Sequence, residues 1–425
     1  SDLATNGICY LDFGLDCSGL PSELLPYLDL FGTILTEIGT RRLDYMQFAK
    51  AINQCTGGFS HSFQAYLRAD SRDTVRPILW LHVKVLSSFL EEALDLVNEV
   101  LTSVDFSDAH RIDEIVQREY AWAEHSAHSD GYSLAATNAF AHLSLAGRYH
   151  EYVHGIHAYL HLKHLAGHYE PEEARLLAAL EQIRDHLFCR RGLTVAITAE
   201  AADIERFRAL GAATVNSLAD LAVTPAQPEF SLGARTRACT TSADVVYNVQ
   251  ACTLFPQPEA YNGRFEVLRT WLSRDYLWNT VRQKNGAYGC FIQFNHLSGN
   301  FGMVSYRDPQ VRRTYEAYEA LPAVIGEMEV GVELLDQLVI GAYGSCVPHL
   351  GPAARGAAAR NDYLCGITPA VRRQRLAELL ATTAGDLREF APLFAELQRS
   401  RCRTTLGSAS RIEQDRNLFE QITEL

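Results

Sequence analysis

One pattern occurs twice in this chain of 425 residues, and it limits the folds that the chain can adopt. In each half a short helix ends at glycine, a β-hairpin follows, and a long amphipathic helix comes next. Gly57-Gly58-Phe59 opens the first hairpin. Gly286-Ala287-Tyr288 opens the second, roughly 230 residues later, which is about one domain length. The repeat predicts an α+β fold of two related αβ domains, each with an antiparallel-rich sheet covered by helices.

The first domain is predicted over residues 1–218, and it carries an additional helical block. Its strands follow from the alternation of apolar and polar residues, and its helices follow from apolar residues at helical spacing. In order, the predicted elements are strand 7–15, helices 21–38 and 43–54, hairpin strands 58–68 and 76–86, helix 87–102, a helical stretch 109–188 with a break near 127–135, strand 192–199 and helix 201–217.

A linker is predicted over residues 219–236, because this segment contains Pro225 and Pro228 and has no clean periodicity. The second domain then occupies residues 237–425. Its predicted elements are strand 243–254, helices 259–272 and 275–284, hairpin strands 287–295 and 300–307, helices from about residue 309, and a final strand 402–411.

Charge and cysteine usage exclude several classes of protein. The net charge of −13 argues against a nucleic-acid-binding protein, which needs a basic face to neutralise phosphates. The ten cysteines include no C-x-x-C pair and are expected to be free thiols in a reducing compartment. No apolar run approaches the roughly 20 residues of a membrane helix, so no membrane partner is expected.

The segment His150-Glu151-Tyr152-Val153-His154 matches the H-E-x-x-H pattern of zinc peptidases. On a helix this spacing places two imidazoles one turn apart, with Glu151 as a possible base and Glu173 or a neighbour as a third ligand. A second interpretation is open. Six histidines recur at spacings of three and four, and they are predicted to form a stripe down one helix, as a polar or interfacial face would: His150, His154, His157, His161, His164 and His168.

A second candidate site lies where the helix before the second hairpin ends. Gly286 is the expected helix stop, Arg282 lies in the last turn, and Tyr288 opens the following strand. A guanidinium and a phenol in these places can both donate hydrogen bonds to a peptide carbonyl or a developing oxyanion. The alternative is that Arg282 caps the helix and Tyr288 packs on the sheet.

This same segment carries a family resemblance. The runs YLWNTVRQKNGAYG and SGNFGMVSYRDP resemble the C-terminal half of presequence proteases, a branch of the pitrilysin/insulinase family of zinc peptidases. The runs TNGICYLDFGLDCSGLPSELLPYLDLFGTILTEIGT and YMQFAKAINQCTGGFSHSF resemble the third of the four family domains. The resemblance extends over nearly the whole chain and is weakest across residues 105–185.

The resemblance implies a function. In the family, two halves close around a chamber that admits short unfolded peptides, and an inverted zinc motif, H-x-x-E-H, lies in the first domain. That motif does not occur in this chain, so the zinc is expected in an N-terminal catalytic half, in the same polypeptide or in a partner chain. Arg282 and Tyr288 match the family's arginine and tyrosine, which contact the substrate backbone near the scissile bond. The match at His150–His154 then becomes a coincidence.

Three functions therefore stay open. The first is the substrate-binding half of a zinc oligopeptidase, inactive by itself. The second is a non-catalytic relative that acts as a scaffold or partner subunit. The third is an independent zinc peptidase built on His150, Glu151 and His154. The expected compartment is the bacterial cytoplasm, or an organellar matrix in a eukaryote.

Overall fold

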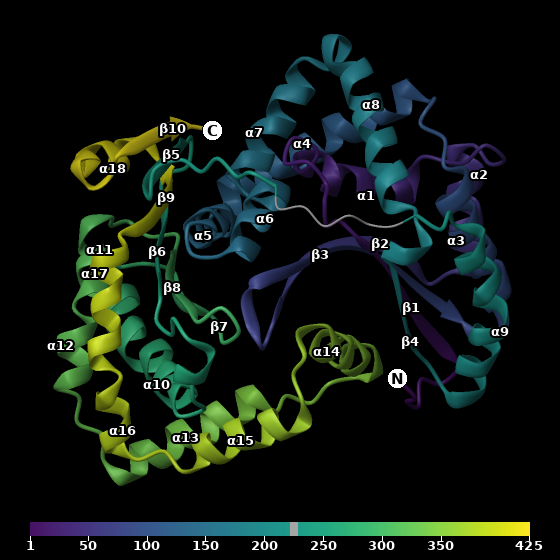
Figure 1. The fold of residues 1–425 in the computed structure, drawn as a ribbon. Coiled ribbons are helices and arrows are strands. Elements are labelled where there is room, and N and C mark those ends of the chain that lie inside the picture. Colours follow the sequence, from purple (N-terminus) through teal and green to yellow (C-terminus); the bar gives the residue numbers. More distant parts are fainter. Residues whose placement is uncertain (222–227) are drawn as a thin grey trace.

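The computed structural model describes residues 1–221 and 228–425, so Pro225 of the predicted linker lies outside the described residues. The first half forms a sheet with helices on one face (Figure 1). Its elements are β1 (Ile8–Asp16), η1 (Leu25–Tyr27), α1 (Leu28–Glu37), α2 (Tyr45–Cys55), β2 (Gly58–Arg68), β3 (Ser71–Leu86), η2 (Ser87–Phe89), α3 (Leu90–Ser103), α4 (Ala109–Asp130), α5 (Tyr132–Ala141), α6 (Leu145–His154), α7 (Ile156–Gly167), α8 (Tyr169–Leu187), η3 (Arg190–Gly192), β4 (Leu193–Thr198) and α9 (Ala201–Ser217).

The second half forms a larger sheet with its own helices. Its elements are β5 (Thr236–Thr241), β6 (Val246–Thr253), η4 (Pro258–Ala260), α10 (Phe265–Trp271), η5 (Leu272–Tyr276), η6 (Trp278–Lys284), β7 (Gly289–Asn295), β8 (Asn300–Tyr306), α11 (Arg312–Glu319), α12 (Leu321–Gly326), α13 (Val332–Cys346), α14 (Pro352–Cys365), α15 (Pro369–Leu380), α16 (Ala384–Glu389), η7 (Ala391–Ala395), α17 (Glu396–Ser400), β9 (Cys402–Ser408), α18 (Ala409–Gln414), η8 (Arg416–Leu418) and β10 (Gln421–Glu424).

The sheet topology confirms the α+β prediction and the internal repeat. The first sheet has the order β2-β3-β1-β4, and every neighbouring pair is antiparallel. The second sheet contains the same arrangement as β7-β8-β6-β9, again antiparallel throughout. Two further strands extend it, because β5 pairs in parallel with β9 and β10 pairs in parallel with β5. Each hairpin therefore places its first strand, β2 or β7, at the outer edge of its sheet.

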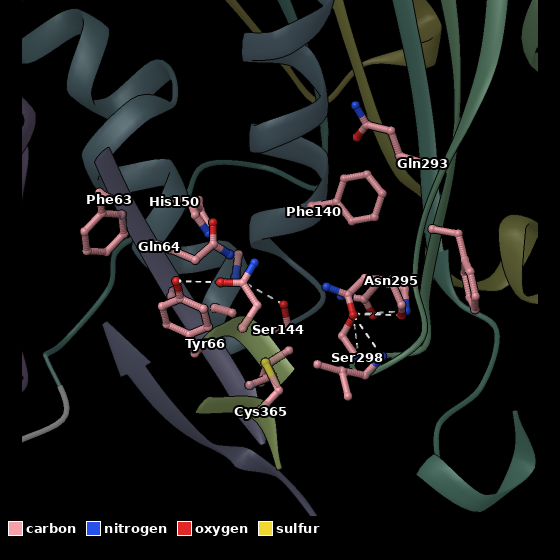
Figure 2. A pocket seen from close by; sticks show the side chains of 18 of the residues that line it. Phe63, Gln64, Tyr66, Phe140, Ser144, His150, Gln293, Asn295, Ser298 and Cys365 are labelled. Carbon is pink, nitrogen blue, oxygen red and sulfur yellow. Dashed lines mark hydrogen bonds between the residues drawn. The ribbon is translucent and has the colours of Figure 1, made fainter. Parts of the chain in front are cut away.

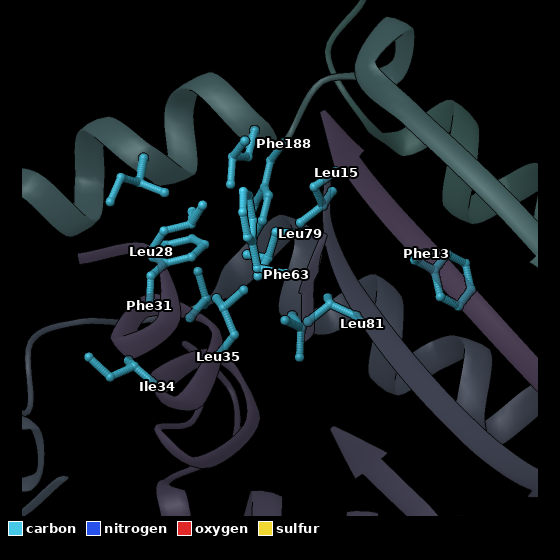
Figure 3. Packing of buried hydrophobic residues seen from close by; sticks show 14 of the residues in the cluster. Phe13, Leu15, Leu28, Phe31, Ile34, Leu35, Phe63, Leu79, Leu81 and Phe188 are labelled. Carbon is cyan, nitrogen blue, oxygen red and sulfur yellow. The ribbon is translucent and has the colours of Figure 1, made fainter. Parts of the chain in front are cut away.

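The core of the first half lies on one face of its sheet. Odd-numbered positions of β1 and β3, such as Phe13, Leu15, Leu79 and Leu81, are buried there, as the two-residue period of a strand requires. Figure 3 shows Leu15, Leu79 and Leu81 around Leu28, Phe31 and Leu35 of α1, with Phe188 beside them.

The opposite face of each sheet is covered by a helix from the other half of the chain. Ala135, Ala136 and Ala139 of α5 pack on the second sheet, against buried residues that include Tyr247 and Leu406. In return, α14 crosses to the first sheet (Figure 1), where Leu364 and Cys365 join a cluster with Tyr66, Ile78 and Trp80. The two halves thus exchange helices.

The structure differs from the predicted elements in five details. The helix expected from Pro21 begins only at Leu25, and the expected strand 402–411 ends at Ser408, where α18 follows. Strand β5 lies partly in the expected linker, and β10 was not predicted. The histidine stripe is not on one helix: Gly155 has an extended backbone (φ −89°, ψ −163°) that ends α6 and starts α7, and His168 ends α7.

Across the described ranges, none of the helices is both long and apolar enough to cross a bilayer.

Candidate functional site

The segment that leads to the second hairpin has an unusual helical form. Residues Leu272–Tyr276 and Trp278–Lys284 wind as π-helical turns, which are rare and often occur at functional sites. The helix ends at Gly286, whose φ of +86° lies in the left-handed region that glycine adopts without strain. The Gly286 N–H donates to the Arg282 carbonyl at 3.0 Å, and the Ala287 N–H donates to the Val281 carbonyl at 3.2 Å. Gly286 is therefore the helix stop, as predicted.

Arg282 is half-buried near the end of this helix, and its guanidinium carbon lies 3.8 Å from the ring centroid of Trp278. Within residues 1–221 and 228–425, none of the ion pairs includes Arg282. The positive charge of Arg282 also acts on Cys290 of β7. Burial raises the pKa of the Cys290 thiol to about 11, and Arg282 partly offsets this rise. The guanidinium is thus held in place by stacking and keeps its hydrogen-bond donors available.

Tyr288 stands directly before β7 and is 69% exposed. Its backbone N–H donates to the Arg307 carbonyl at 3.3 Å, and its ring lies 6.0 Å from that of Tyr306. The structure therefore places Arg282 and Tyr288 on the two sides of the Gly286 turn, next to one open sheet edge. The Tyr288 side chain lies beside Tyr306 of β8 and stays largely exposed to solvent.

A cavity of about 540 Å³ lies between the two halves and is lined by both outer strands. Figure 2 shows Gln64 and Tyr66 on one wall, with Gln293 and Asn295 on the other. Six consecutive residues of β2, 62–67, and three of β7, 293–295, line it. Successive side chains of a strand point to opposite faces, so a cavity lined by consecutive residues runs along the strand edge. Outer strands present main-chain groups without a sheet partner, and such an edge can accept an extended peptide.

Arg282 and Tyr288 do not line this cavity, and the residues that do were not predicted from the sequence. Gln293 of β7 is five residues beyond Tyr288, which corresponds to roughly 17 Å along an extended chain. The repeat of two hairpins was visible in the sequence, but the strand order that puts β2 and β7 at the edges was not. Knowledge of that strand order would have been needed to predict the cavity.

The histidines of the H-E-x-x-H match and its glutamate point to different surroundings. The rings of His150 and His154 lie 5.6 Å and 5.9 Å from the ring of Phe63. His154 Nδ1 is 3.7 Å from Asp29 Oδ1, which is also 3.2 Å from His61 Nε2. Burial lowers the pKa of His150 to about 4, so this imidazole is neutral at pH 7.

Glu151 is only 2% exposed and is bound inside the helical block. Its Oε1 accepts hydrogen bonds from the Asn138 side-chain amide and from the His157 backbone N–H, both at 3.1 Å. Burial raises the pKa of Glu151 to about 7. Because this carboxylate binds Asn138 and His157 instead of facing the two imidazoles, the three residues do not fit a zinc-peptidase centre.

Glu173, on α8, does not complete a metal site with these residues or with others. Among the residues whose placement is described, no group of three or more His, Cys, Asp and Glu side chains could hold a metal ion.

Comparison with known families gives two matches, one on each side of the predicted linker. Residues 1–165 match a family model for the region associated with peptidases of family M16, subfamily C. Residues 238–406 match the model described as "PreP C-terminal domain". The second match contains both Arg282 and Tyr288.

Individual relatives agree with these matches. Protein HypA of Clostridium perfringens is 27% identical over 421 residues, which cover 99% of this chain and 43% of that protein. Presequence protease 1 of Arabidopsis thaliana, a chloroplastic and mitochondrial protein, is 28% identical over 425 residues, which cover 98% of this chain and 38% of that protein. The chain therefore spans about two fifths of the length of these relatives.

The fold has solved counterparts. A crystal structure described as a peptidase M16 inactive domain from Pseudomonas fluorescens superimposes with a TM-score of 0.64 at 12% identity, covering 96% of this chain and 94% of that one. At this identity the likeness shows the fold alone. With both family models and the relatives, it leads to one conclusion: the chain belongs to the M16 peptidases and corresponds to the C-terminal half of the presequence-protease-like members.

Proposed function

We propose that this chain is the substrate-binding half of a zinc-dependent peptidase that degrades short unfolded peptides in a closed chamber. An N-terminal catalytic half, in the same polypeptide or in a partner chain, would hold the zinc and activate the attacking water. Residues 1–218 and 237–425 would be the third and fourth domains of such an enzyme, joined by 219–236. This chain is then inactive by itself.

The observation that carries the proposal is the state of Arg282. Its guanidinium is stacked on Trp278, and the ion pairs of the described residues do not use it. A cation that is held in place and has no carboxylate partner is prepared for an oxygen from another molecule. Together with the hydroxyl of the exposed Tyr288, it would bind the substrate carbonyl and stabilise the oxyanion that forms there.

The course of β7 supports a peptide substrate. The strand begins just after Tyr288 and ends at Asn295 in the cavity between the halves. A peptide that adds to this edge would run from the Arg282–Tyr288 turn towards the cavity, and its main chain would supply the affinity without a demand on sequence. Such binding suits an enzyme that accepts many unfolded peptides.

Replacement of Tyr288 by phenylalanine in the complete enzyme tests the proposal. We expect kcat for a fluorogenic peptide to fall about 10²–10³-fold, because one donor to the oxyanion is lost, while the bound zinc stays unchanged. Tyr363→Phe is the matched control, since Tyr363 is 82% exposed on α14 and should keep full activity. An unchanged kcat in Tyr288→Phe would exclude the role of this hydroxyl.

A non-catalytic scaffold or partner subunit is the second candidate. The coding sequence upstream of Ser1 separates the two functions. An H-x-x-E-H motif there supports the peptidase, whereas a related region without this motif supports the scaffold.

A further inference from the structure

A second cavity, of about 380 Å³, lies in the second half of the chain and combines an apolar wall with several cations. It is enclosed by α10, the end of α13, α15 and the turn after β7. Val347, Ile367, Leu376 and Leu379 provide apolar surface. Phe294 lines both this cavity and the larger one between the halves, so the two cavities are neighbours at this side chain.

Most charges in this cavity already have partners. Arg269 pairs with Glu266 at 2.6 Å, and the other oxygen of Glu266 accepts a hydrogen bond from the Tyr261 hydroxyl at 2.8 Å. Arg372 pairs with Asp362 at 2.6 Å. Each of these cations is therefore compensated by a carboxylate of the chain itself.

Arg375 differs from its neighbours, because it is half-buried and the ion pairs found in the described part of the chain do not include it. Its guanidinium carbon lies 5.2 Å from the ring centroid of Tyr261. The nearby Glu378 accepts hydrogen bonds from the Gly263 N–H at 2.7 Å and from Gln374 at 2.9 Å. Burial lowers the pKa of Arg375, although Tyr261, Glu378 and Glu266 nearby act in the opposite direction.

His296 adds a second group without a partner. Its Nε2 atom is buried and has no hydrogen-bond partner among the described residues, and its ring lies against Tyr261 with a centroid distance of 5.8 Å. Buried polar atoms are normally hydrogen-bonded. Arg375 and His296 thus present two unused donors to one small cavity whose remaining surface is largely apolar.

We propose that this cavity binds the C-terminal carboxylate of a peptide whose last residue is apolar. The carboxylate would accept hydrogen bonds from Arg375 and His296, and the last side chain would lie against Leu376 and Leu379. This inference rests on the proposed function, since the peptide would reach the cavity along β7 past Phe294. The cavity would then be a binding site for the C-terminal end of the substrate, separate from the site formed by Arg282 and Tyr288.

The test compares peptides that differ only at their C-terminus. Fluorescence anisotropy would measure the binding of a labelled peptide ending in leucine to the chain, once with a free carboxylate and once as the amide. We expect the free acid to bind about tenfold more tightly, because the amide removes the charge that Arg375 recognises. A third peptide, amidated but with a glutamate at its end, shows whether an acidic side chain serves equally well.

Arg375→Gln should bring the ratio of acid to amide affinity close to one, whereas Arg373→Gln should preserve it. Arg373 is an exposed residue of the same helix and does not line the cavity, which makes it the matched control. Equal affinity of the wild-type chain for acid and amide would overturn this inference and leave the proposed function intact. Equal binding of the glutamate peptide would reassign the cavity to acidic side chains and overturn the assignment to the terminus. Failure of all three peptides to bind would overturn both proposals.

Discussion

Burial of Glu151 couples the proton of this residue to folding. The pKa of its carboxyl rises from 4.5 to about 7 because the side chain is removed from water. Between these values the folded chain binds a proton that the unfolded chain has released. The contribution of Glu151 to stability is therefore complete below about pH 4.5 and is lost as the pH rises to 7.

Replacement of Glu151 by glutamine should remove this dependence. Relative to the wild type, Glu151→Gln should gain up to about 3 kcal/mol between pH 4.5 and pH 8. Urea unfolding at several pH values measures the difference between the two proteins. Buried histidines such as His150 change stability with pH in the opposite direction, but they do so equally in both proteins, so their contribution cancels in the difference.

Glu170→Gln serves as the control for this measurement, because Glu170 is exposed on α8. Its stability relative to the wild type should stay constant with pH. A constant difference in Glu151→Gln as well would show that folding does not raise the pKa of Glu151.

The same residue shows what sequence can reveal about a site. The H-E-x-x-H motif is present in the sequence, but it does not determine the orientation of Glu151. That orientation depends on Asn138 and on the turn at Gly155, and neither is part of the motif. Arg282 and Tyr288 could be selected from sequence, because a helix stop and a following strand fix their neighbourhood. Arg375 could not be selected from the sequence. It stands out because none of the ion pairs among the described residues includes it, and tertiary packing decides which charges form pairs.

At the level of elements, Gly155 separates α6 from α7 for a steric reason. A Cβ atom at this position would lie 2.1 Å from Glu151 Oε2 and 2.7 Å from the Glu151 Cα. Gly155→Ala should therefore destabilise the chain by about 1–3 kcal/mol, because either the buried carboxylate or the turn must move. Thermal unfolding of the variant gives the value.

Gly167 offers a matched comparison at the end of α7. A Cβ there would meet nothing within 4 Å, so Gly167→Ala should be neutral or slightly stabilising. A loss in Gly167→Ala as large as that in Gly155→Ala would mean that the clash with Glu151 is not the cause.

Helices and hairpins with a strong period were predictable, and the exceptions share a physical reason. β5 (TRACTT) and β10 (QITE) are short, and they gain their strand structure from parallel pairing with distant segments. The break at Gly155 depends on a neighbouring side chain instead of a local preference. Local pattern determines an element when its own residues bury a face, and it fails when distant partners supply the contacts.

At the scale of the whole molecule, the two halves depend on each other although the sequence repeats. Helix α5 approaches the second sheet closely because its contact residues are alanines, and Asn138 accepts a hydrogen bond from Thr404 Oγ1 at 3.0 Å. In the other direction, Arg360 of α14 pairs with Asp12 at 2.7 Å and lies 4.3 Å from the ring of Trp80. Each half thus completes the core of the other.

This exchange predicts that neither half is stable by itself. Residues 1–218 alone would expose Trp80 and the alanine face of α5, and residues 228–425 alone would expose Tyr247 and Val249. Each separate piece should bind a hydrophobic dye and aggregate, whereas the two pieces refolded together should form a one-to-one complex with little dye binding. Analytical ultracentrifugation and dye fluorescence of the pieces, separate and mixed, measure this. The full chain should unfold in one transition, because opening either half exposes the other. Two monomeric pieces that fold without binding dye would show that the exchanged helices only join two independent domains.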